Sequence, residues 1–373
     1  MTKLNLEELT NLNLLLSIEG IGPGKIKILL KKFGSAQNVI NASEKDLIGT
    51  ERINKLLATR IINEVKNKSK IEAKTKRELD RISDLNIKIT SLWDTDYPEL
   101  LKNIYDPPLL LYYKGEISDS DKYSVAIVGT RNPTEYGKSQ AQRIASELAS
   151  QNITIVSGLA RGIDSVAHAA ALKSNGRTIS VIGSGLNVIY PPENRKLFEE
   201  ISEKGIIYSE YNLDTPPDAG NFPQRNRIIS GLSLGCLVVE SGLRGGALQT
   251  AQFALDENRE VFAIPGNLGI KQSEGTNGLI QRGNAKLVKD AEDIFAELEL
   301  KLKPMIGKNI PKPKPDLNLF EEKLLNILGD EQIQIDKIAS LSDLSTSDCL
   351  VHLLQLEFKG LVKQLPGKVF SVI

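Results

Sequence analysis

From residue 122 to about residue 300 the chain alternates short apolar runs with stretches of helical character. The apolar runs are three to five residues long and end in small or polar residues, as buried strands do. A strand–helix–strand repeat predicts βαβ units, and therefore a parallel sheet with helices on both faces. We expect an α/β fold with a Rossmann-like, doubly wound, mostly parallel sheet. The expected strands are 125–128, 153–156, 178–182, 206–208, 236–239 and 261–264.

Glycines follow five of these strands, and three of the five turns also carry an arginine. In an open α/β sheet, ligands bind beyond the carboxyl ends of the strands. Glycines let backbone N–H groups approach an anion there, the following helices point their positive ends at it, and arginine offers a planar fork to phosphate oxygens. The pattern predicts a phosphate-binding crevice. Its candidate residues are Gly129, Thr130, Arg131, Ser157, Gly158, Arg161, Gly162, Gly183, Gly185, Gly245 and Gly246, joined by Arg225, Asn226 and Arg227 from the segment FPQRNRIISGLS (222–233).

The motifs of nucleotide cofactors are missing. A dinucleotide fingerprint needs G-x-G-x-x-G after the first strand, whereas this chain reads GTRNPTEYG with Arg131 at the second glycine position. No G-x-x-x-x-G-K-[ST] sequence occurs, and two histidines and two cysteines are too few for a metal cluster. We therefore expect no cofactor, no metal ion and no catalytic residues. Several separate phosphate seats favour a chain of phosphates, and so single-stranded nucleic acid.

The net charge of the whole chain does not favour anion binding. Forty-seven basic residues balance forty-seven acidic ones, so anion binding has to come from the arrangement of particular side chains. No run approaches the ~20 apolar residues that a bilayer span needs, and the N-terminus lacks the basic and apolar regions of a signal peptide. We expect a cytoplasmic protein with no membrane contact.

Composition divides the chain into four segments. Residues 1–68 are expected to form a helical domain, 69–300 the sheet domain with an N-terminal arm, 301–318 a Pro/Lys linker, and 319–373 a winged helix. The stretch IEGIGPGKIKILL (18–30) matches a helix-hairpin-helix pattern. That pattern either contacts a phosphate, which Lys25 and Lys27 would favour, or serves as a packing module, and the sequence leaves both interpretations open. The winged helix carries few basic residues on its third helix, which favours a protein contact.

The strings that carry these features resemble the DNA-processing protein A family (DprA, also called Smf). They are VAIVGTRNPTEYG (125–137), SGLARGIDSVAHAAAL (157–172), GSGLNVIYPPENRKL (183–197), FPQRNRIISGLS (222–233), ES…GGALQTA (240–251), FAIPGN (262–267) and GTNGLIQRGN (275–284). They cover the expected sheet domain in order. The helical N-terminal segment and the winged-helix tail are also found in members of this family.

The resemblance implies a cytoplasmic, non-catalytic DNA-binding protein of bacteria. The family binds single-stranded DNA taken up in natural transformation, protects it, and helps to load the RecA recombinase past single-strand-binding protein. Its members form homodimers through the Rossmann-like domain. By this resemblance the DNA phosphates would contact Arg131, Ser157, Gly158, Arg161, Gly162, Arg225, Asn226 and Arg227, while Gly183 and Gly185 would let the strand approach closely.

Three details bear on this interpretation. The family often has a basic residue after the Tyr-Pro of the third motif, whereas here Glu193 follows two prolines. Tyr136 is a candidate for stacking on a base, and Asp164 is expected to cap its helix and to orient Arg161. The main alternative is a nucleoside-monophosphate phosphoribohydrolase, which the fold also resembles. That enzyme needs a glutamate after its glycine loop, where this chain has Gln249 and Thr250, so a general acid or base is missing.

Overall fold

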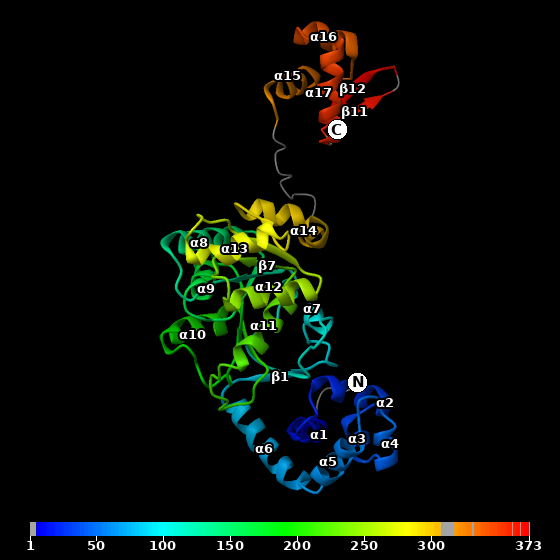
Figure 1. Ribbon diagram of the computed structural model, residues 1–373, viewed down its shortest axis with the longest axis vertical. Coiled ribbons are helices and arrows are strands. Elements are labelled where there is room, and N and C mark those ends of the chain that lie inside the picture. The colour runs from blue at the N-terminus through cyan, green and yellow to red at the C-terminus, as the bar shows by residue number, and fades with distance from the viewer. Residues whose placement is uncertain (1–4, 307–316, 330–331, 360, 366, 373) are drawn as a thin grey trace. The chain divides into compact units, whose positions relative to one another are not determined.

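The computed structural model describes residues 5–306, 317–329, 332–359, 361–365 and 367–372 (Figure 1). The chain separates into two compact units, Met1–Gly307 and Lys308–Ile373. Buried side chains form a separate hydrophobic core in the second unit, around Leu324, Leu353 and Phe370. Within the described ranges, no helix is both long enough and apolar enough to cross a bilayer.

Within residues 5–306, nine strands form one sheet. Strand β2 runs antiparallel to both its neighbours, and the strands from β6 to β9 pair in parallel. In sheet order the strands are β1 (Lys88–Ser91), β2 (Leu110–Gly115), β6 (Ile206–Ser209), β5 (Thr178–Ile182), β4 (Thr154–Ser157), β3 (Ser124–Val128), β7 (Gly235–Val238), β8 (Glu260–Ala263) and β9 (Lys286–Leu287). The expected doubly wound, mostly parallel sheet is confirmed.

All six predicted strands are present, each within one residue of the expected bounds at either end. The strands β1, β2 and β9 were not predicted from the sequence. The first two lie in the segment interpreted as an arm, where prolines interrupt the apolar run, and β9 is only two residues long. Such short or proline-flanked strands carry no periodic pattern of their own.

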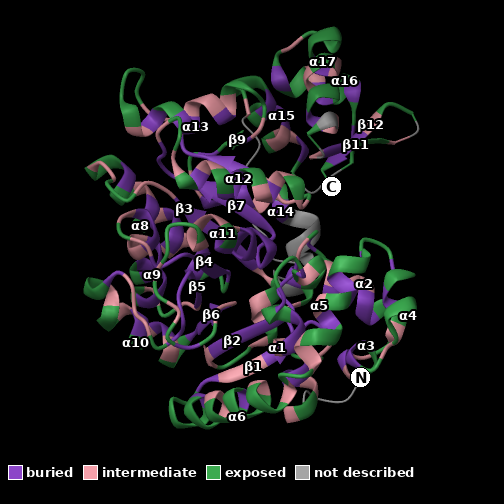
Figure 2. Ribbon diagram, turned by 60° about the horizontal axis from the view of Figure 1, so that its bottom comes forward, coloured by how far each residue is buried: buried purple, intermediate pink, exposed green. Residues whose placement is uncertain are grey.

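Alternate side chains of the central strand enter different cores, because successive residues of a strand point to opposite faces. Val125 and Ile127 pack with helices α8 (Glu135–Ser150), α9 (Ile163–Lys173) and α14 (Ala291–Ile306). Ala126 and Val128 pack on the other face with α11 (Asn221–Gly231) and α12 (Gly246–Asp256). The central strands of the sheet are therefore buried on both faces, and Figure 2 draws them in purple.

Short helices precede the sheet. Asparagine and serine side chains cap the N-termini of four of them by accepting a hydrogen bond from the third helical residue. These helices are α1 (Leu6–Ser17), α2 (Pro23–Phe33), α3 (Ala36–Ile40), α4 (Glu44–Ile48) and α5 (Lys55–Val65), with α2 the uncapped one. The next, α6 (Lys68–Asp84), is largely exposed, as its charged sequence predicts. The remaining helices of the first unit are α7 (Glu99–Lys102), α10 (Arg195–Lys204) and α13 (Lys271–Gln281).

The second unit has the order of elements of a winged helix, as predicted. Asn318 and Glu321 form a reciprocal capping box at the start of its first helix. A small sheet, in which β12 lies between the other two strands, closes the domain. The elements are α15 (Leu319–Leu328), β10 (Ile333–Gln334), α16 (Ile335–Ser342), α17 (Thr346–Phe358), β11 (Val362–Leu365) and β12 (Val369–Val372). The two-residue strand β10 was not predicted.

Candidate functional site

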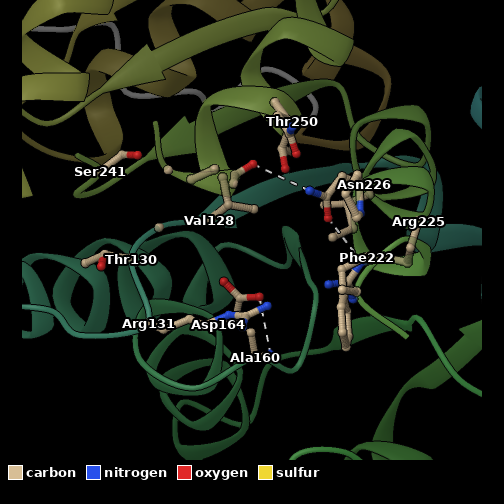
Figure 3. Close-up of a pocket in the computed structure, with 18 of the residues that line it drawn as sticks. Val128, Thr130, Arg131, Ala160, Asp164, Phe222, Arg225, Asn226, Ser241 and Thr250 are labelled. Carbon is tan, nitrogen blue, oxygen red and sulfur yellow. Dashed lines mark hydrogen bonds between the residues drawn. The ribbon is translucent and has the colours of Figure 1, made fainter. Parts of the chain in front are cut away.

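A crevice opens where the strand order of the sheet reverses. The chain winds outward from β3 through β4, β5 and β6 in one direction, and through β7, β8 and β9 in the other. Loops after β3 and β7 therefore diverge to opposite faces, which leaves a hollow at their carboxyl ends. This crevice has a volume of about 680 Å³. Figure 3 shows its walls.

Seven of the fourteen candidate residues line this crevice. The turn after β3, the first turn of α12 and the helix α11 contribute them. They are Gly129, Thr130, Arg131, Arg225, Asn226, Gly245 and Gly246. Gly158 and Arg161 line a narrow hollow that adjoins the crevice and shares Arg131 and Arg225 with it. The fold thus places predicted segments that are nearly 120 residues apart in the sequence at one edge of the sheet.

Two arginines beside the crevice lie over aromatic rings. The guanidinium of Arg131 lies 5.4 Å from the ring centre of Phe222. That ring is 5.8 Å from the ring of Tyr190, over which the guanidinium of Arg161 lies at 5.9 Å. Cation–π contacts hold the planar groups in place without neutralising their charge. We did not predict Phe222 and Tyr190, although both stand inside the motifs of the sequence.

The two arginines differ in their ionic partners. Arg131 is exposed, and no ion pair to it is found among the described residues. The Nε of Arg161 donates to the carboxylate of Glu193, which follows the two prolines of the third motif. This ion pair raises the pKa of Arg161 and lowers the pKa of Glu193. The orientation of Arg161 therefore comes from Glu193 rather than from Asp164, which corrects our expectation.

Arg225 lines the crevice but is almost fully buried, with 4% of its surface exposed. Its Nη1 donates to the carbonyl oxygens of Gly158, at 2.7 Å, and of Val181. The buried carboxylate of Asp164 accepts from the N–H groups of Gly158 and Ala160, at 3.1 and 3.4 Å. Asp164 thus organises the turn after β4 and forms no side-chain cap on α9.

Burial dominates the titration of both groups. It lowers the pKa of Arg225 to about 10, although the nearby Asp164 carboxylate acts in the opposite direction. It also raises the pKa of Asp164 despite the attraction of Arg225. The two opposite charges attract each other inside the fold, and the hydrogen bonds of Arg225 to Gly158 and Val181 anchor the turn after β4 to α11.

Arg227 is directed away from the crevice. Its Nη2 donates to both carboxylate oxygens of Glu210 at 2.7 and 2.8 Å, and its Nε lies 3.5 Å from Asp106. Residues two apart on a helix project about 200° apart, so Arg225 and Arg227 leave α11 on different sides. The structure does not bring Arg227 to the other candidates.

Several candidate backbone groups are occupied within the protein. The Thr130 N–H donates to the carbonyl of Glu240 at 2.8 Å, and the Gly158 N–H is bound by Asp164. The hydroxyl of Ser157 donates to the carbonyl of Ile127 at 2.6 Å. By contrast, no hydrogen bond is found among the described residues for the N–H groups of Gly246 and Ala247, the first two residues of α12, and both residues line the crevice. Arginines and the start of α12 therefore supply the accessible positive charge.

The remaining glycines make room for the protein's own chain. Gly162 has a φ of +81°, and a Cβ there would lie 2.4 Å from the carbonyl oxygen of Thr130. The turns after β3 and β4 are packed against each other at this point. A Cβ on Gly183 would lie 3.1 Å from the ring of Phe222, and one on Gly185 would lie 2.5 Å from the carbonyl oxygen of Asn212. Both glycines thus face protein atoms.

The start of α8 is occupied by a carboxylate of the protein. The buried side chain of Glu240 accepts from the N–H of Thr134 at 2.9 Å and from its hydroxyl at 2.5 Å. This carboxylate takes the place of an external anion at the first helix of the fold. Tyr136, which we considered for base stacking, lies beside a separate cavity and donates to the carbonyl of Pro265 at 2.9 Å.

The crevice does not favour glycosidic-bond hydrolysis. Gln249 and Thr250 line it at the positions where the hydrolases carry carboxylates. Among the described residues of its lining, Asp164 has a carboxylate, and two backbone N–H groups already bind it. The arrangement lacks an accessible general acid or base.

The helix-hairpin-helix lysines are engaged within the first unit. The ammonium of Lys25 donates to the carbonyl of Gly20 at 2.8 Å, within the hairpin itself. Burial lowers the pKa of Lys27, with Asp106 acting in the opposite direction. Both observations favour the packing interpretation of this motif.

A doubly wound α/β domain with an arginine-lined crevice, preceded by a helix-hairpin-helix and followed by a winged helix, defines a class of nucleic-acid-binding proteins. The family model of DNA recombination-mediator protein A matches residues 88–299. The DprA winged helix domain matches 310–368, and the SAM-like helix-hairpin-helix tandem matches 12–67. The chain belongs to the DNA recombination-mediator protein A family.

Named relatives agree. The Protein Smf of Synechocystis is 36% identical over 94% of this chain and 95% of its own length. The DNA processing protein DprA of Bacillus subtilis is 45% identical over 60% of this chain and 76% of its own. The crystal structure of DprA from Streptococcus pneumoniae is similar with a TM-score of 0.66 and 35% identity, covering 79% of this chain and 99% of that one.

One solved relative is described for its binding of DNA. The structure of DNA processing protein A from Helicobacter pylori, which addresses its single-stranded DNA binding mode, has a TM-score of 0.52 and 33% identity. It covers 57% of this chain and 97% of the Helicobacter chain.

Proposed function

We propose that this protein is a single-stranded DNA-binding recombination mediator whose crevice seats successive phosphates of one strand. The observation that carries the proposal is the row of neighbouring side chains beside the crevice, in which the guanidiniums of Arg131 and Arg161 lie over the rings of Phe222 and Tyr190. Two guanidiniums fixed over rings lose little conformational freedom when they bind a phosphate. The single-stranded DNA binding of the Helicobacter relative supports the same ligand.

The residues of the site divide into two roles in this proposal. Arg131 and Arg161 contact phosphates, and the first N–H groups of α12, at Gly246, add the positive end of a helix. Arg225 and Asp164 hold the turn after β4, so they are positioning residues. A single strand can enter the crevice, whereas a duplex carries its phosphates on a stiff outer surface. We therefore expect selectivity for single-stranded DNA.

The wider role follows from the family resemblance. We propose that the protein protects incoming single-stranded DNA during natural transformation and helps to load the RecA recombinase on strands covered by single-strand-binding protein. A homodimer would align two crevices on the DNA, and the cytoplasm is the compartment in which these partners meet. These steps rest on the resemblance, together with the anion-binding crevice described above.

The experiment is a salt titration of binding to fluorescent single-stranded and duplex oligonucleotides. We expect tight, salt-steep binding that is selective for the single strand. Arg131→Ala should weaken it and reduce the slope of log affinity against log salt by about one charge. Lys173→Ala removes one exposed charge from the opposite end of α9 and should leave both quantities unchanged.

Two results would overturn the proposal. Absence of binding at moderate salt would exclude the DNA function, and nucleoside monophosphates would then be the ligands to test. If Arg131→Ala and Lys173→Ala changed the affinity and its salt dependence equally, the crevice would not be the DNA-binding site. The mediator role is tested by the ATPase rate of RecA on strands coated with single-strand-binding protein, which should rise when the protein is added.

A further inference from the structure

The crevice is larger and less polar than a row of phosphates requires. Its volume of about 680 Å³ extends beyond the arginines to a wall formed by α11 and α12. Pro223 and Ile229 line that wall from α11, and Ala247 lines it from α12. These groups have nothing to offer an anion. A flat, apolar group with a polar edge matches this part of the crevice.

Two primary amides stand beside the apolar wall. Asn226 accepts from the Nε of Arg225 at 3.2 Å, which holds it in place. Gln249 lies in the first turn of α12 and is exposed, and no hydrogen bond of its side chain is found within the described residues. An amide presents a donor and an acceptor side by side, which is the pattern that pairs with the edge of a nucleobase.

We propose that the crevice takes in one nucleobase of the bound strand, with its faces against the apolar wall of α11 and α12 and its edge on Gln249. The inference rests on the proposed function and deepens it, since it divides the crevice into a phosphate side and a base side. Arg131 marks the phosphate side, and Gln249 marks the base side. Binding then depends on the bases as well as on the charge of the strand.

DNA strands without bases separate the contribution of the bases to binding from that of the phosphates. The probes are fluorescent strands of oligo-dT and oligo-dA, and an abasic strand of the same length and charge, each with the full-length protein. The strands with bases should bind about tenfold more tightly than the abasic strand. The slope of affinity against salt should be the same for all of them, because the phosphates are unchanged.

Gln249→Ala tests the residue that the inference names. This variant should weaken binding of the strands with bases severalfold and leave the abasic strand unaffected. Gln252→Ala is the matched control, because Gln252 is also an exposed glutamine of α12 but binds Asp256 at 2.8 Å instead of lining the crevice. Arg131→Ala should weaken every strand, including the abasic one.

The outcomes distinguish this inference from the function on which it rests. Equal affinity for abasic strands and strands with bases, with Arg131 still required, overturns the base site and leaves the phosphate function standing. A Gln249→Ala variant that weakens all strands alike also overturns it. If no strand binds, the proposed function itself fails. Weaker binding of the variant to strands with bases alone supports the base site.

Discussion

The buried pair of opposite charges at the crevice allows a sharp prediction for Arg225→Met. Methionine has a similar length and is apolar, so the substitution removes the charge and the hydrogen bonds with little loss of volume. Asp164 is then left as a buried carboxylate with backbone N–H groups and no cation. The carbonyl groups of Gly158 and Val181 lose their donor at the same time.

The magnitude follows from these losses. Removing one of two buried opposite charges costs about 3–5 kcal/mol, because Asp164 loses the attraction of Arg225 and two buried carbonyl groups lose their donor. Exposure does not reduce this figure, since Arg225 is 4% and Asp164 is 6% exposed. For a domain of this size such a loss lowers the melting temperature by about 6–20 °C. The double variant Asp164→Asn/Arg225→Met should lose less than the sum of the two single variants.

Differential scanning calorimetry of the full chain is the assay, because the winged helix is a separate compact unit and we expect it to melt in a separate transition. The melting of the sheet domain should move in Arg225→Met, and that of the winged helix should stay. A sheet transition within 1–2 °C of the wild type (on the order of 0.5 kcal/mol) would refute the reasoning. Strictly additive effects in the double variant would show that the two charges are not coupled.

Three further predictions concern other groups. Burial raises the pKa of Glu257 from 4.5 to about 7. Between these two pH values the folded chain keeps a proton on Glu257 that the unfolded chain has lost. Stability should therefore fall by up to about 3 kcal/mol as pH rises through this range. Glu257→Gln should be more stable than the wild type at pH 8 and equal to it at pH 4, measured by thermal melting. Gly162→Ala should destabilise the fold by about 1–3 kcal/mol and weaken DNA binding, because it displaces Thr130; normal melting and affinity would contradict this. Phe222→Ala should weaken DNA binding severalfold through Arg131, while Phe222→Tyr should preserve it, as fluorescence anisotropy would show.

The strands of the sheet were predictable because each carries its own signal. The strand 178–182, for example, is an apolar run between two polar turns, and the structure has β5 at the same residues. The same argument predicted the glycine turns and their meeting at one edge, since parallel strands end together. It could not predict β1, because that strand depends on pairing with β2 rather than on its own pattern.

The candidate site was predictable in its location and less so in its details. Arg225, Asn226 and Arg227 look equivalent in the sequence, yet the first anchors a turn, the second lines the crevice, and the third binds Glu210. The rotation of α11 about its own axis decides where each of these side chains points. That rotation is fixed only when α11 packs on the sheet. The stacking of Arg131 on Phe222 likewise joins residues 91 positions apart.

Sequence alone determined the class of fold, the edge of the sheet at which the candidate residues meet, and the family to which the chain belongs. Those conclusions need only local hydrophobic patterns and motifs in order. Tertiary structure decided which arginines stay free, because charge is neutralised by whichever side chain packing brings near. Glu240 binds the start of α8, and Asp164 binds the turn after β4. Arg131 instead packs against the aromatic ring of Phe222, which leaves its charge available.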